Sequence, residues 1–123
     1  MRLVRYGEPG AEKPGMLDDA GQLRDLSLVV GDITPKQLDP AALTILRSID
    51  PKTLPAVSGK PRLGPPVSGV GKMICIGLNY KDHAEEVNKA PPDEPQIFNK
   101  AINSLCGPND PIIRPKNSQK LDH

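Results

Sequence analysis

Aromatic residues are scarce in this sequence of 123 residues, which has no tryptophan, one phenylalanine and two tyrosines. Large aromatic rings carry much of the burial in an ordinary core, so that role falls here to leucine, isoleucine and valine. Apolar residues still make up 37% of the chain, too many for a disordered segment of low hydrophobicity. Length and composition predict one domain, or a small domain joined to the start of a larger one.

Neither sign of charge is in excess, because 16 basic residues stand against 15 acidic ones and the net charge is +1. The charges are scattered, without the basic cluster and stacking aromatics of a nucleic-acid binder or the basic patch that acidic membranes attract. No apolar run approaches the roughly 20 residues that cross a bilayer. Glycine and proline also interrupt the N-terminal MRLVRYGEPG before a signal-peptide core could form. We therefore expect a soluble cytoplasmic protein that binds neither nucleic acid nor membranes.

Cysteine is rare as well. Cys75 and Cys106 do not have the spacing of a metal-binding pair. Each lies in an apolar stretch, which predicts buried free thiols.

The 15 prolines and 11 glycines divide the chain into short pieces. Residues 2–6 alternate as a half-buried strand does, and the turn-rich residues 18–22 join two apolar runs into a predicted hairpin. A helix is predicted to begin with Asp39 as N-cap and Pro40 in the first helical position, and to end at Asp50-Pro51.

Residues 51–72 are rich in proline and glycine and have no sustained periodicity, which predicts a linker or an extended surface crossing. We place a boundary near residue 69. The predicted fold class is α+β, with residues 1–68 as a small N-terminal α/β domain and residues 69–123 as the start of a second domain.

After the linker, MICIGL at residues 73–78 is a continuous apolar run that predicts a buried strand with a bend at Gly77. Residues 79–87 have helical propensity, and Pro91-Pro92 prevents the helix from extending. Further predicted elements are a strand at 95–100, a turn at 107–111 and a short third strand that starts at Ile112-Ile113.

His83 and Glu86 are the most informative polar pair. In a helix, their i to i+3 spacing places both side chains on one face, with about 5–6 Å between the Cβ atoms. A carboxylate beside an imidazole orients its tautomer and stabilises the imidazolium, which makes the histidine a useful general base. The alternative is a solvated surface pair, the commoner occurrence on an exposed helix.

Further polar residues follow the predicted strands. Asn79 and Tyr80 come after the strand that ends in glycine, at the kind of strand exit where ligands collect. Lys100 ends the next predicted strand, and Ser104 follows four residues later. A lysine there could bind a carboxylate or stabilise an enolate. The alternative is an exposed lysine at a strand end.

Three segments carry a specific pattern: ICIGLNYKDHAEE at 74–86, EPQIFNK at 94–100 and SLCGPNDPIIRP at 104–115. Their G-x-N-Y-x-x-H-x-x-E pattern, followed by F-x-K, resembles the fumarylacetoacetate hydrolase family. The leading MRLVRYGEPG resembles the small first domain of ureidoglycolate-lyase-like members, and the terminal SQKLDH continues the likeness. The resemblance implies that residues 69–123 contain the opening strands and lid helix of a catalytic β-roll.

In that family, the histidine matched by His83 is a general base that activates water, and the glutamate matched by Glu86 orients it. The lysine matched by Lys100 lies beside the oxygen atoms of the substrate. The residues expected to bind substrate are Asn79, Tyr80 and Ser104. Family members, usually homodimers, split or isomerise 2-oxo and 1,3-dicarbonyl acids. They use Mg²⁺ or Mn²⁺ because C–C cleavage leaves a carbanion that a divalent cation and a lysine stabilise as an enolate.

The sequence departs from the family at the metal. Members place it on a Glu-x-Glu pair directly after the segment matched by residues 120–123, and on a later aspartate, neither of which is present here. Hard divalent cations need several oxygen ligands in fixed geometry. The remaining carboxylates, Asp82, Glu85, Glu86 and Asp122, do not reproduce that set. We therefore expect no metal ligands in this chain, and whether it is an active enzyme stays open.

Three functional hypotheses follow. The first is the truncated N-terminal portion of a metal-dependent hydrolase or lyase with an oxo-acid substrate, which forms a homo-oligomer or associates with the missing portion. The second is a partner-binding or structural remnant that recruits another chain through unpaired strand edges. The third is a small-molecule binder that keeps the pocket wall without turnover.

Overall fold

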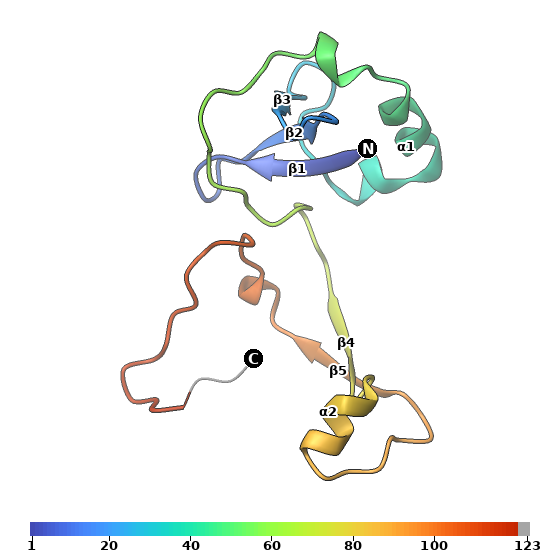
Figure 1. Cartoon of the computed structure of the whole chain (residues 1–123), viewed down its shortest axis with the longest axis vertical. Helices are drawn as coiled ribbons and strands as arrows, with labels where there is room; N and C mark the ends of the chain where they lie inside the picture. Colours follow the sequence, from blue (N-terminus) through green and yellow to red (C-terminus); the bar gives the residue numbers. More distant parts are fainter. Residues whose placement is uncertain (121–123) are drawn as a thin grey trace. The chain divides into compact units, whose positions relative to one another are not determined.

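The computed structural model describes residues 1–120 of the chain (Figure 1). Its contacts form two compact units: residues 1–68 with the chain from Cys106 onward make the first, and Gly69–Leu105 make the second. Two small sheets and a few short helices make the fold α+β, as predicted. The assignment of residues 69–123 to one domain stays a prediction.

The first unit contains an antiparallel sheet with the strand order β1-β2-β3. The strands are β1 (Arg2–Tyr6), β2 (Lys13–Leu17) and β3 (Leu23–Asp25). Between β2 and β3, Gly21 adopts φ +80°, and the carboxylate of Asp18 accepts a hydrogen bond from the backbone N–H of Gln22 at 2.9 Å. The predicted hairpin is confirmed.

The helix α1 (Pro40–Arg47) begins where its sequence signals place it. The backbone N–H of Ala41 donates to Oδ1 of Asp39 at 2.9 Å, and Pro40 fills the first helical position, where its missing N–H costs nothing. Two short 3-10 helices flank it, η1 (Pro35–Leu38) and η2 (Pro51–Thr53).

The core of the first unit is aliphatic, as the composition predicts. Met16, Leu26 and Leu54 form its centre, and three partly buried side chains pack around them: Leu3, Val30 and Ile49. These residues come from the sheet and from the segments on both sides of α1, so the core joins the strands to the helical region.

Residues 54–68 cross the first unit in extended form and are attached to the sheet. Isolated bridges pair Arg24 with Ala56 and Tyr6 with Leu63. Of the two possibilities left by the sequence, a linker or a surface crossing, the structure has the crossing.

Arg62 connects this crossing to two other segments of the first unit. Its Nε and Nη2 donate to the two carboxylate oxygens of Asp110 at 2.7 and 2.6 Å, and its Nη1 donates to Oε1 of Glu12 at 3.0 Å. We call these three residues the Arg62 bridge. The backbone N–H of Gly107 also donates to Asp110, at 2.6 Å, so the bridge attaches the predicted turn at 107–111 to the crossing.

The Arg62 bridge keeps its acidic members ionised. The Arg62 guanidinium and the N–H of Gly107 hold the pKa of the Asp110 carboxyl below its usual range. Burial alone would raise the pKa of Glu12, but hydrogen bonding to Arg62 and the charge of Arg5 outweigh it, and that pKa is also lowered.

The second unit consists of a two-stranded antiparallel sheet and a short helix. Its elements are β4 (Met73–Gly77), α2 (Lys81–Glu86), β5 (Gln96–Lys100) and the 3-10 helix η3 (Ile102–Ser104). The predicted strands and helix are confirmed, with small differences at their ends. The register pairs Gly77 with Gln96 and Met73 with Lys100.

Three expectations about burial and pairing are wrong. Strand β4 is not buried: Ile74 and Ile76 are 60% and 41% exposed, because a two-stranded sheet is not covered on that face. Ile112-Ile113 form no strand and lie exposed, since the described chain offers them no pairing strand. Cys75 is half-buried and Cys106 exposed, although both are free thiols as expected.

No helix within residues 1–120 is long and apolar enough to cross a membrane.

Candidate active site

The helix α2 carries the predicted catalytic pair, directly after the end of β4 (Figure 1). Leu78 turns the chain with φ +50°, and Tyr80 is the N-cap of the helix without a side-chain capping bond. In the first turn, the carboxylate of Asp82 accepts the backbone N–H of His83 at 2.9 Å, and its charge suits the positive end of the helix.

His83 and Glu86 lie side by side, as the helical spacing predicts. Nδ1 of His83 is 3.3 Å from Oε2 of Glu86, and their side chains are 47% and 70% exposed. With its proton on Nδ1, the ring donates to the carboxylate and Nε2 carries the lone pair that can accept a proton. The arrangement has the geometry of a general base with an orienting carboxylate.

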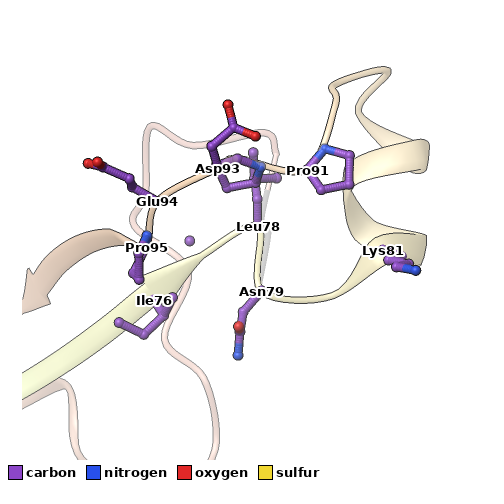
Figure 2. A pocket seen from close by; sticks show the side chains of 10 residues that line it. Ile76, Leu78, Asn79, Lys81, Pro91, Asp93, Glu94 and Pro95 are labelled. Atoms are coloured by element: carbon purple, nitrogen blue, oxygen red, sulfur yellow. The ribbon is translucent and has the colours of Figure 1, made fainter.

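A cavity of about 350 Å³ lies at the exit of β4 (Figure 2). The end of β4, Asn79 and Lys81 form part of its lining, and the loop at 91–95 before β5 forms the rest. Figure 2 shows Asp93 and Glu94 extending from that loop. The volume falls at the lower end of the range for small-molecule sites, so a small organic acid is a suitable size.

The predicted residues near α2 differ in their relation to this cavity. Asn79 lines it, whereas Tyr80 is 72% exposed and is not among its lining residues. His83 and Glu86 follow within the next turns of the same segment and also lie outside the lining.

Lys100 and Ser104 lie at the other end of the sheet. The antiparallel register pairs Lys100 with Met73, and Oγ of Ser104 donates to the carbonyl of Ala101 at 2.7 Å and lies 4.0 Å from Sδ of Met73. Four residue steps at roughly 3.4 Å separate this end from Gln96, or about 14 Å. The sheet therefore does not bring Lys100 beside the exit of β4, and the catalytic and binding roles of the predicted residues stay predictions.

Sequence reasoning missed Asp93 and Glu94 as cavity residues. In the sequence, Pro91-Pro92 indicates the end of the helix, and neither acidic residue is predicted to bind a ligand. The sequence has no local signal for this placement, because it depends on the antiparallel return to β5, which brings the residues just before Gln96 to the exit of β4.

The described residues do not fit a Mg²⁺ or Mn²⁺ site on their own. Within residues 1–120, no three His, Cys, Asp or Glu side chains are grouped as metal ligands would be. The cavity offers two carboxylates, Asp93 and Glu94, whereas hard divalent cations take about six or more oxygen ligands.

Residues 72–123 match a family model described as the C-terminal part of fumarylacetoacetate (FAA) hydrolase. Over this segment the chain is similar to the fumarylacetoacetate hydrolase family. The α2 pair and the cavity both lie inside the fumarylacetoacetate hydrolase segment.

Curated relatives match nearly the whole chain. A Burkholderia cenocepacia protein is 57% identical over 122 residues, and proteins of B. ambifaria and B. multivorans are 56% and 55% identical. Each match covers 99% of this chain and 43% of the relative. The names of these proteins class them provisionally as hydrolases, and the chain spans less than half of their length.

Proposed function

We propose that the chain supplies a general-base pair and one wall of the substrate pocket to a hydrolase or lyase of the fumarylacetoacetate hydrolase family. The substrates would be 2-oxo or 1,3-dicarbonyl acids. The observation that carries the proposal is the 3.3 Å approach of His83 Nδ1 to Glu86 Oε2, one short turn from a cavity of about 350 Å³.

The proposed chemistry begins at Nε2 of His83, which takes a proton from water as the oxygen attacks a carbonyl carbon. The Glu86 carboxylate stabilises the resulting imidazolium. Breakage of the neighbouring C–C bond leaves its electron pair on the departing carbon, as an enolate. In a lyase of the ureidoglycolate type, the same base would remove a hydroxyl proton. Mg²⁺ or Mn²⁺ is the cofactor expected for the complete enzyme, and no step is assigned to it because the described residues do not hold it.

The family-specific fold is part of the same proposal. We take β4 and β5 as the opening strands of a β-roll and α2 as its lid helix. A two-stranded sheet is marginally stable alone in water, which favours a larger sheet around it. Lys100 and Ser104 are proposed to contact substrate oxygen atoms from the other end of this sheet, and their roles need variants separate from those of the pair.

The test is turnover of acylpyruvates and ureidoglycolate with Mg²⁺. It uses the chain alone and a chimera in which the chain replaces the matched region of the B. cenocepacia relative. In the active form, His83→Gln is expected to lower kcat by about 10²–10⁴-fold, and Glu86→Gln by less, since positioned proton transfer contributes about that much. Glu85→Gln, one residue away on the same helix, is the matched control. Full kcat in His83→Gln would refute the proposal.

The exposed apolar face of the β4–β5 sheet favours a second candidate, a partner-binding or structural remnant. Ile76 and Ile97 are paired across the two strands on this face and are 41% and 69% exposed, and the outer strand edges offer N–H and C=O groups for strand addition. Native mass spectrometry separates the cases: a homo-oligomer or a captured chain without turnover supports the remnant, and a folded monomer argues against it.

A further inference from the structure

The helix that carries the pair receives little support from packing. Of the six residues of α2, Ala84 is the one that is buried, and both members of the pair are largely exposed. Isolated helices shorter than about 12–15 residues are marginal in water. The hydrogen bonds that end α2 are therefore one of the supports of the helical spacing between His83 and Glu86.

The C-terminal end of α2 is closed by Asn88. This residue has φ +52°, in the left-handed region that L-residues rarely adopt. Its backbone N–H donates to the carbonyl of Glu85 at 3.0 Å, and the N–H of Lys89 donates to the carbonyl of Ala84 at 2.8 Å. These two bonds form the Schellman motif, in which asparagine is the usual substitute for glycine because its short polar side chain tolerates the conformation.

We propose that Asn88 is a positioning residue for the His83–Glu86 pair. Glu86 is the last residue of α2, two positions before Asn88, so it lies inside the turn that the two bonds close. If Asn88 leaves the left-handed region, both bonds are lost and the last turn opens. Glu86 then no longer stands one helical turn from the imidazole.

This inference deepens the proposed function, because the pair matters for catalysis only if that proposal holds. Its test is independent of turnover. The imidazole ¹⁵N signals of His83 report its contact with Glu86, and the exchange rate of the Lys89 amide reports the motif. Both are measured by NMR on the 123-residue chain, with Glu86→Gln defining the signal of a ring that lacks the carboxylate.

The informative variants are Asn88→Gly and Asn88→Val. Glycine adopts the left-handed conformation freely, so the His83 signals should stay as in the parent chain. Valine is disfavoured there, so the Lys89 amide should exchange about tenfold faster and the His83 signals should move toward those of Glu86→Gln. Amides of β4 and β5 check that the unit is folded. If Asn88→Val also unfolds β4 and β5, as their amide signals would show, then Asn88→Ala, with its smaller side chain, is compared with Asn88→Gly instead.

Two results would overturn the inference. In the first, Asn88→Val, or Asn88→Ala where it replaces it, keeps the His83 signals of the parent chain while the Lys89 amide exchanges faster. In the second, Asn88→Gly loses these signals as Asn88→Val does, which would make the asparagine side chain the relevant group. If Glu86→Gln itself leaves the His83 signals unchanged, the pairing is absent and the inference fails with it. If the chimera with the parent sequence has no turnover while the His83 signals of the parent chain still differ from those of Glu86→Gln, the proposed function fails and the inference about Asn88 stands.

Discussion

Substitution of Gly107 by alanine should open the turn that follows the second unit. A Cβ atom built on Gly107 would lie 2.0 Å from the carbonyl oxygen of Leu63 and 2.9 Å from Oδ2 of Asp110, whereas real Cβ contacts stay above 3.0 Å. The first of these neighbours is backbone, and it is held in place by the crossing over the sheet. The methyl group can therefore be accommodated only if the turn moves away from the crossing.

The cost of this movement is large for a single methyl group. Forcing an extra methylene into a close-packed site costs about 1–3 kcal/mol, and a contact this short belongs at the upper end. The movement also breaks the 2.6 Å hydrogen bond from the Gly107 N–H to Asp110. About 3 kcal/mol corresponds to an opening equilibrium on the order of 100-fold more favourable. Hydrogen exchange read by mass spectrometry should show this acceleration in peptides that cover residues 105–112.

The matched control is Gly31→Ala in the same unit. No atom lies within 4 Å of a Cβ at that position, and its φ is outside the left-handed region. That variant should be neutral or stabilised by about 0.4–1 kcal/mol through the unfolded state. Equal exchange of residues 105–112 in the two variants would refute the close approach of Gly107 to the crossing.

Acid should weaken the first unit. The pKa values of Asp110 and Glu12 are lowered in the folded chain, so their stabilisation is complete above the unfolded values near pH 4 and is lost as pH falls through the folded ones. Calorimetry of Asp110→Asn should give a lower unfolding midpoint than that of the parent chain at neutral pH. The midpoint of the variant should also fall less steeply as pH is lowered, and the same slope as in the parent chain would contradict this. Burial, with hydrogen bonding to Asp25, raises the pKa of Tyr6 to about 12. An ultraviolet titration should therefore show one tyrosine ionising near pH 12. The stabilisation that the un-ionised Tyr6 gives to the folded chain is complete below about pH 10 and is lost as pH rises through 12. Tyr6→Phe should remove the titration step near pH 12. Ile97→Thr should leave stability within about 0.5 kcal/mol and reduce binding of an apolar dye, because this side chain is 69% exposed on β5.

The positions of the helices and strands could be predicted because their signals are local. Asp39 and Pro40 begin α1 through hydrogen bonding and a fixed φ, and Gly21 supplies the conformation that the β2–β3 hairpin needs. Burial could not be predicted in the same way. The run ICIGL would look the same whether another layer covers β4 or leaves Ile74 and Ile76 exposed, because coverage depends on distant parts of the fold.

The separation of Lys100 from the exit of β4 has a topological cause. A helix between two strands is typical of a parallel crossover, in which both strands end at the same edge. Here the strands pair antiparallel, so their carboxyl ends lie at opposite edges. The His83–Glu86 spacing could be predicted because it lies within one helix. The contact of Arg62 with Asp110 joins residues 48 positions apart and leaves no local pattern.

That same separation determines when the first unit can be completed during synthesis. Arg62 leaves the ribosome with Glu12 already made, but Asp110 follows 48 residues later. At roughly 5–20 residues per second, the second carboxylate arrives about 2–10 s after the guanidinium. In that interval the chain makes all of β4, α2 and β5. The N-terminal unit, although it starts first, is therefore finished only after the segment that bears the histidine has been made.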